Sequence, residues 1–297
     1  MIAPDVDPGP DLPAQRLASV DAFPAVRGYA SLAFERRGSR TVLARSRVES
    51  PMTVIRPFHL PDGRLVVQLI TLGPGLCGGD TLHIDVTAGG GAQVVVTTTA
   101  ATRVMTMDPD CHAEQHVRLR AEAHASLEYY PAVTIPFPGS ALVQTVRVAA
   151  EASARVGVLE AWALGRTARG EYLQFRSLAS RTTLHVDGTI AYADAMQMDP
   201  ASSDVASVAI LAGRRYVASG FWYGASLPTG SSGDAEYGAS RDERGTLVAF
   251  AHSTPSLVYL RALGDDAPSL DAVLRRSLDR LADGWNLPPV HLDRFRC

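Results

Sequence analysis

The chain contains no lysine, and all 28 of its basic side chains are arginine. Without lysine there is no Schiff-base nucleophile, no lysine general base and no phosphate-binding lysine of the usual nucleotide-binding loop. The glycine-rich segment LGPGLCGGD (72–80) therefore lacks the side chains that such a loop needs. Tight turns between strands explain its glycines more simply.

Cysteine is also scarce. Cys77, Cys111 and Cys297 form an odd set with no CxxC pair, which argues against a disulfide framework and suits a reducing, cytoplasmic location. The N-terminus is acidic and interrupted by prolines, unlike a signal peptide, and no apolar run reaches membrane-spanning length. The net charge of −3 provides no general basic field. We therefore expect a soluble protein with neither a nucleic-acid nor a membrane partner.

The residues that are present predict one β-rich domain. Residues 1–26 hold five prolines and little periodicity, so we expect a flexible leader before a single domain over 27–297. With 46% hydrophobic residues, a chain of this length can bury a substantial core. The Gly- and Ser-rich stretch 227–245 has the composition of a mobile surface loop.

A strand–turn–strand pattern recurs three times. The copies are IDVTAGGGAQVVV (84–96), VRLRAEAHASLEYY (117–130) and VRVAAEASARVGVLE (146–160). Each combines an alternating strand, which is typical of one buried face, with a short turn and an alanine that opens the next strand. These alanines are Ala92, Ala125 and Ala154. The repeat predicts either stacked β-hairpins or the coils of a solenoid-like sheet.

The remaining elements complete a mainly β fold with a small helical portion of about two helices. Asp187-Gly188 predicts a hairpin over 183–193, and further strands are expected at 207–223 and 247–262. Leucines at helical spacing predict a helix over 270–282, capped by Ser269 and ended by Gly284. A second helix is expected near 197–212.

Two groups of residues are candidates for metal binding or nucleophilic chemistry. Cys111, His112 and His116 are metal ligands by residue type, yet no second ligand pair lies at characteristic spacing, which favours surface histidines. Cys77 as a nucleophile needs a positioned base, and the sequence identifies none.

Aromatic and charged residues around two turns are candidates for partner binding. Tyr129, Tyr130 and Phe137 in LEYYPAVTIPF (127–137) are either ordinary core or an aromatic anchor for a partner. Arg166 and Arg169 lie in a strand-to-strand turn, as either an ion-paired turn or an interface.

Five segments together resemble one family, the urease accessory protein UreD, also called UreH. They are ARSRVESPMTVIRPF, PGLCGGD, GAQVVVTTTAATRV, LEYYPAVTIPF and GRTARGE, in that order between Gly28 and about Tyr192. The chain departs from the family pattern at Cys77, where the family turn usually reads PGGLVGGD. It also departs at Ala132-Val133, which replaces an acidic position before Thr-Ile-Pro-Phe.

The resemblance implies a β-rich accessory protein without catalytic activity of its own. Such a protein binds UreF and, through it, the GTPase UreG, docks onto apo-urease and helps deliver nickel. No tightly bound cofactor is expected, and nickel(II) is in transit. Asp80 and Glu171, each in a glycine-containing turn of a family-like motif, are the candidate nickel-passage residues. Two alternatives stay open: a β-solenoid adaptor unrelated to urease, and a Cys77-dependent hydrolase.

Overall fold

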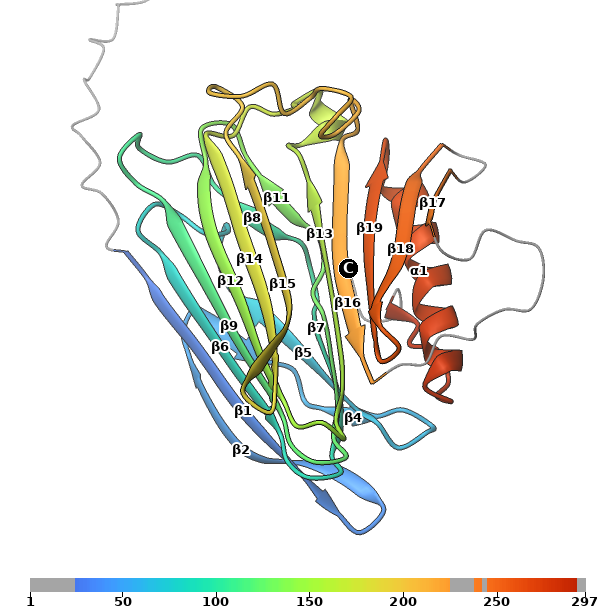
Figure 1. Cartoon of the computed structure of the whole chain (residues 1–297). Helices are drawn as coiled ribbons and strands as arrows, with labels where there is room; N and C mark the ends of the chain where they lie inside the picture. The colour runs from blue at the N-terminus through green and yellow to red at the C-terminus, as the bar shows by residue number, and fades with distance from the viewer. Residues whose placement is uncertain (1–24, 225–237, 242–244, 293–297) are drawn as a thin grey trace, which may run out of the picture.

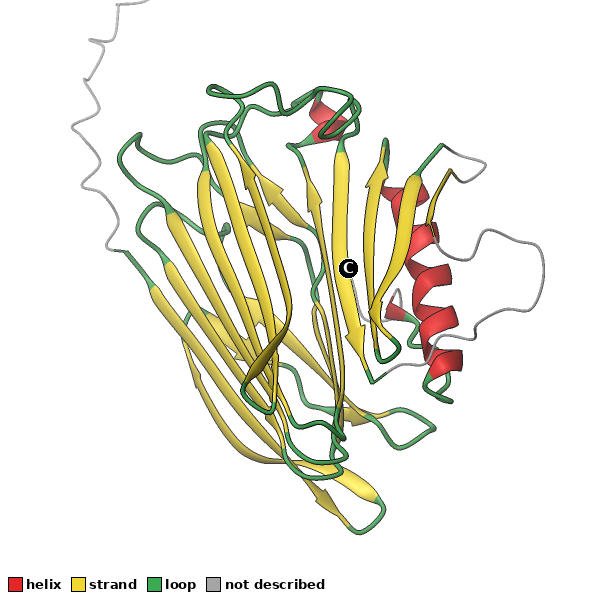
Figure 2. Cartoon of the chain, in the orientation of Figure 1, coloured by secondary structure: helices red, strands yellow, loops and turns green. Residues whose placement is uncertain are grey.

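Two β-sheets lie face to face, with one helix on the outside of the larger sheet (Figure 1). The computed structural model describes residues 25–224, 238–241 and 245–292. Sheet A contains, in spatial order, β15 (Thr189–Met198), β14 (Ser177–Val186), β12 (Ala141–Ala150), β9 (Ala113–Ala121), β6 (Thr81–Ala88), β1 (Arg27–Arg37) and β2 (Arg40–Glu49). The mainly β class is confirmed, as Figure 2 shows by colour.

Sheet B follows a longer path beneath sheet A. Its main order is β17 (Gly238–Arg241), β18 (Leu247–Thr254), β19 (Leu257–Gly264), β16 (Tyr216–Tyr223), β13 (Arg155–Ala163), β10 (Ser126–Tyr130), β7 (Gln93–Thr98), β5 (Leu65–Thr71) and β3 (Met52–Val54). The short strands β4 (Phe58–His59), β8 (Thr102–Val104) and β11 (Thr134–Pro136) pair at its margin.

The three sequence repeats are solenoid coils rather than hairpins, because each repeat crosses from sheet A to sheet B. Strands β6, β9, β12 and β14 pair in parallel in sheet A, and β5, β7, β10 and β13 pair in parallel in sheet B. At each crossing Ala92, Ala125 or Ala154 donates a backbone hydrogen bond of 2.8–3.0 Å to the residue three positions earlier. All three alanines are buried. The next coil bonds directly to the first two, because Ser126 N–H donates to the Ala92 carbonyl and Arg155 N–H donates to the Ala125 carbonyl.

The hairpin predicted at 183–193 is confirmed as the β14–β15 connection. Asp187 and Gly188 have φ angles of 46° and 81°, the left-handed conformation that a tight two-residue turn between twisted strands requires. The prediction of a helix near 197–212 is wrong, because residues 199–213 form successive turns after β15. The strand predicted at 207–223 is present only from Tyr216 onward, as β16. Asp199 explains part of this, because its side chain and carbonyl accept hydrogen bonds from the residues that follow it.

The described residues contain one α-helix, α1 (Ala267–Gly284), and a short 3-10 turn, η1 (Thr167–Arg169). The helix predicted at 270–282 is therefore present, but it begins three residues earlier. Asp266 caps it instead of Ser269, accepting a hydrogen bond from the Ser269 N–H at 2.8 Å. The leucine face of α1 packs on sheet B in a second core, separate from the core between the sheets.

Part of the predicted loop 227–245 is a strand. Gly238–Arg241 form β17, which pairs antiparallel with β18, and 227–237 and 242–244 lie outside the described residues. Of the predicted leader, residues 1–24 also lie outside them. None of the helices in the described ranges is long and apolar enough to cross a membrane.

Candidate functional site

A buried carboxyl group, Glu160, lies in the core between the two sheets. Strand β13 turns Val156, Val158 and Trp162 toward that core, and Glu160 occupies the same face of the strand. The Gln144 side-chain amide donates a hydrogen bond to Glu160 from the facing sheet, and the Thr182 hydroxyl donates a second one at 3.3 Å. Burial raises the pKa of Glu160 to about 7, although both hydrogen bonds oppose the shift.

Further polar side chains continue from Glu160 across both sheets. In sheet A, Gln115 is the register neighbour of Gln144, and Asp194 is the register neighbour of Thr182. In sheet B, Ser219 lies directly opposite Glu160, and Arg261 lies opposite Ser219. We call this set the polar seam: Gln115, Gln144, Glu160, Thr182, Asp194, Ser219 and Arg261.

One end of the polar seam reaches solvent between β15, the edge strand of sheet A, and β19 of sheet B. Asp194 accepts hydrogen bonds from the Ser219 hydroxyl at 2.7 Å and from the Arg261 guanidinium at 2.6 Å. The side chains of Asp194 and Arg261 are 20% and 39% exposed, whereas Glu160 is buried. The seam therefore runs from the core to an exposed ion pair.

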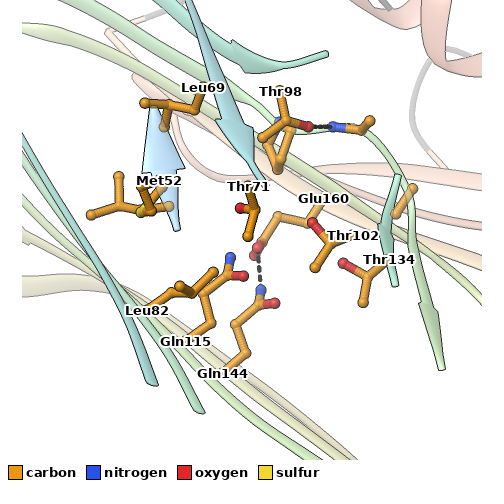
Figure 3. Close-up of a pocket in the computed structure, with 14 residues that line it drawn as sticks. Met52, Leu69, Thr71, Leu82, Thr98, Thr102, Gln115, Thr134, Gln144 and Glu160 are labelled. Atoms are coloured by element: carbon orange, nitrogen blue, oxygen red, sulfur yellow. Dashed lines mark hydrogen bonds between the residues drawn. The ribbon is translucent and has the colours of Figure 1, made fainter. Parts of the chain in front are cut away.

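At its other end the polar seam opens into a small cavity (Figure 3). The cavity measures about 20 Å³, which is room for about one water molecule. Its polar lining consists of hydroxyl, amide and carboxyl groups from both sheets: Thr71, Thr98, Thr102, Gln115, Thr134, Gln144 and Glu160. Figure 3 shows the Gln144–Glu160 hydrogen bond at this wall.

Two larger depressions adjoin this cavity. One, of about 310 Å³, lies along the loops that end β5 and β7, and it shares Thr71, Thr98 and Thr102 with the cavity. The other is an apolar groove of about 350 Å³ between sheet B and α1, which shares Pro131 and Ala132 with the cavity. Pro131 and Ala132, which follow β10, thus separate the core cavity from the groove.

The structure places the two predicted nickel-passage residues in turns, away from the cavity. Asp80 is buried and accepts hydrogen bonds from the backbone N–H groups of Val26 and Cys77, both at 2.8 Å. Glu171 pairs with Arg166, whose Nε lies 2.7 Å from Glu171 Oε2. Neither carboxylate lines the core cavity, and their role in nickel passage stays a prediction.

The candidate interface residues divide into buried and accessible ones. Tyr129 and Tyr130 are 0% and 2% exposed, so of the two alternatives the structure supports ordinary core and contradicts an aromatic anchor for a partner. Phe137 is half-buried beneath the Arg166 guanidinium, 4.2 Å from its ring centroid. Arg169 is exposed in η1 and is open to a partner.

The candidate metal ligands His112 and His116 lie on the outer face of sheet A. Both imidazoles contact the Glu114 carboxylate, at 2.9 Å and 2.8 Å, and His116 also stacks on His83. The two histidines lower the pKa of Glu114 by hydrogen bonding to it. Among the described residues, no group of three or more His, Cys, Asp or Glu side chains has a metal-binding arrangement.

The environment of Cys77 does not favour a nucleophile. Burial and the nearby Asp80 carboxylate raise the pKa of the thiol, which opposes thiolate formation. Its sulfur lies 4.0 Å from the Gly75 carbonyl, its only hydrogen-bond partner in the described chain. The hydrolase alternative has no support here.

Sequence reasoning did not identify Glu160, although one local signal was present. Glu160 is a single carboxylate within RVGVLEAWA, a strand that is otherwise almost entirely apolar. Carboxylates are almost never fully buried unless they are paired, so a carboxylate in such a run marks an unusual site. Its partners Gln144 and Thr182 are not apparent from spacing alone.

Fold and site together define a β-coil protein whose two sheets enclose a polar seam, with a helix packed outside. The model of the UreD urease accessory protein family matches residues 26–296. The chain belongs to the UreD family of urease accessory proteins.

Three named relatives support this assignment over most of the chain. UreD 1 of a Synechococcus strain is 35% identical over 87% of this chain and 92% of the relative. UreD of Deinococcus radiodurans is 33% identical and UreD 2 of Streptomyces griseus is 36% identical, each over 90% of this chain and 94% of the relative.

Proposed function

We propose that the chain is a scaffold for urease maturation and that nickel(II) passes along its polar seam. In this role it binds UreF and, through UreF, the GTPase UreG, and it docks onto apo-urease in the cytoplasm. Membership of the UreD family supports the accessory role. The observation that carries the nickel route is the buried Glu160 carboxyl, which lies beside a water-sized cavity.

The chemistry of the polar seam suits an ion in transit. Nickel accepts carboxylate, imidazole and water ligands, and the seam offers carboxyl, amide and hydroxyl oxygens one after another. A conduit needs ligands that release the ion, since binding must be weak or shared between sites for conduction. We therefore expect the isolated protein to bind nickel weakly, with no tight site of closed geometry.

The test compares adjacent residues that point to opposite faces of β14. Thr182→Val removes a hydroxyl from the polar seam, and Thr183→Val removes one from the outer face of sheet A. Glu160→Leu removes the central carboxyl. Urease activation at limiting nickel is measured on co-expressed urease, with UreF retention checked by pull-down from the same lysates.

Glu160→Leu is expected to lower urease activation at least tenfold, and Thr182→Val is expected to lower it less. Thr183→Val is expected to activate urease like the wild type. All three variants are expected to retain UreF at the wild-type level. Full activation by Glu160→Leu contradicts the proposed route. Asp80→Ala, Glu171→Ala and Glu171→Arg test the turn carboxylates in the same assay. Loss of activation in these variants with the complex intact assigns them to the passage as well.

A further inference from the structure

The outer face of sheet A carries a group of exposed arginines. Strands β6, β9, β12 and β14 turn alternate residues into the core, and the residues between them face outward. Six exposed arginines of β2, β9, β12 and β14 lie at such outward positions: Arg45, Arg47, Arg118, Arg120, Arg147 and Arg181. We call this set the arginine face.

The arrangement of the arginine face is unfavourable for the isolated chain. Arg118 and Arg147 lie directly opposite each other on neighbouring parallel strands. Arg181 lies opposite Thr145, the residue two positions before Arg147 on the same face of β12. Like charges on adjacent strand positions repel and destabilise a sheet. A compensating negative charge is therefore expected from outside these strands.

Carboxylates of the described chain compensate only part of this face. Arg47 pairs closely with Glu49, at 2.6 Å. Arg118 and Arg120 lie 3.8 Å from Asp85 and Glu122, at the limit of an ion pair. Arg45, Arg147 and Arg181 have no carboxylate within 4.0 Å in the described part of the chain. The charges of these three arginines thus stand without a carboxylate partner in the described chain, although the whole chain has a net charge of −3.

The strands beneath the arginine face also lack a cover. Parallel strands ordinarily have both faces covered, usually by helices. Here the described helix α1 covers sheet B, and the outer positions of sheet A remain accessible. Small side chains such as Thr145, Ala149 and Ala179 lie between the arginines on these strands. The guanidinium groups are therefore accessible to another folded protein.

We propose that the arginine face docks a carboxylate-rich surface of a folded partner protein. Charge complementarity across an interface steers association and fixes the orientation of the partners. Arginine suits this task because its guanidinium binds carboxylates through two hydrogen bonds and is weakly hydrated. Nucleic acid is the less suitable occupant, because single-strand binding relies on aromatic stacking platforms. Tyr29, the tyrosine that the described part of this face presents, lies under the Arg47 guanidinium, 5.2 Å from its ring centroid.

The test reverses charge at two exposed positions. The choice of probes rests on the proposed function: tagged chain is co-expressed with apo-urease, UreF and UreG of the same source. In the wild type, at least one of these proteins is expected to dissociate as sodium chloride rises. Arg147→Glu/Arg181→Glu is expected to weaken retention of that same protein at least tenfold. The melting temperature is expected not to fall, because the glutamate introduced at position 147 would lie opposite Arg118 and replace a repulsive pair by an attractive one.

Two controls test whether the effect comes from the loss of positive charge and whether it is specific to the arginine face. Arg147→Lys/Arg181→Lys keeps the positive charge and is expected to retain the partner. Arg280→Glu reverses an exposed arginine of α1, on the other side of the molecule, and is expected to bind like the wild type.

Retention of all co-expressed proteins by the charge-reversed variant overturns the proposal while leaving the scaffold function intact. A wild-type chain that retains none of them contradicts both. A second experiment measures the binding of labelled RNA and DNA oligonucleotides to the wild type and to the charge-reversed variant. Tight oligonucleotide binding that depends on Arg147 and Arg181 overturns the proposal in favour of a nucleic-acid surface.

Discussion

Gln144 on sheet A donates its side-chain amide hydrogen bond to Glu160 on sheet B, so a polar contact joins the two sheets inside their common core. Both residues are nearly inaccessible to solvent, at 3% and 5% exposed. An apolar pair at these positions would avoid the cost of removing a carboxyl from water. The contact therefore costs stability, and it holds a carboxyl with a shifted pKa, a feature that clusters at functional sites.

Glu160→Gln is predicted to stabilise the protein at neutral and alkaline pH. The pKa of Glu160 is about 7 in the folded chain, above the ordinary value of 4.5 expected after unfolding. Between these values the folded state holds a proton that the unfolded state has released, so wild-type stability falls as pH rises from 4.5 to 7. Glutamine keeps the hydrogen-bonding shape without this titration. The stabilisation is about 3 kcal/mol at pH 8 and near zero at pH 4.5.

Urea unfolding of wild type and variant between pH 4.5 and 8 measures this difference. Glu171→Gln is the control, because Arg166 lowers the pKa of Glu171 at the protein surface. A stability difference for Glu160→Gln that does not change with pH would show that the carboxyl is not buried in an apolar core.

Arg64→Met is predicted to destabilise the protein by about 3–5 kcal/mol, the usual result of removing one partner of a buried ion pair. Arg64 is 1% exposed and contacts Glu128 at 2.8 Å, Asp62, and the carbonyl of Pro288 beyond α1. Without the guanidinium, Glu128 remains buried and loses its positively charged partner, and burial already raises its pKa. The double variant Arg64→Met/Glu128→Gln is expected to recover most of the loss. Thermal unfolding of both variants checks this, and equal destabilisation by both contradicts the pairing.

Local chemistry accounts for the parts of the fold that could be predicted. Strand alternation, the Asp187-Gly188 turn and the turn alanines each depend on a few adjacent residues, and each appears as expected. Ser269 was a reasonable cap by residue type, but the chain enters the helix three residues earlier through Asp266. Capping depends on the path of the preceding strand, which the local sequence does not specify.

The candidate site could not be predicted from the sequence, because it depends on which strands face each other in the assembled fold. Glu160 meets Gln144 and Thr182 only because successive coils alternate between the sheets. Asp80 and Glu171 stand out in sequence as carboxylates beside glycines, yet their oxygens are used locally. Turn carboxylates are conspicuous in a sequence, whereas a carboxylate on the inner face of a strand becomes evident only once the sheets are assembled.

Leu274→Asp and Leu278→Asp are each predicted to destabilise the protein by about 3 kcal/mol or more, since each loses apolar burial and places a charge in a core. Both leucines lie on the face of α1 that packs on sheet B, and they are 9% and 6% exposed. Arg280→Asp, on the exposed face of the same helix, is the matched control. Soluble yield and melting temperature are measured for all three. Wild-type values for the leucine variants would show that this face of the helix is not packed.

Asp80→Ala is predicted to lower stability by about 2 kcal/mol, because two backbone N–H groups lose a charged acceptor. Asp80 Oδ1 binds the N–H of Val26 at the entry to β1, and Oδ2 binds the N–H of Cys77 in the preceding turn. Asp80→Asn keeps one acceptor oxygen and is expected to lose about half as much stability. Melting temperature and urease activation are measured on the same preparations. If urease activation falls in proportion to stability across both variants, Asp80 acts by stabilising the fold. Unchanged stability in Asp80→Ala with reduced activation would instead place its carboxylate on the nickel route, because the turn would then hold without it.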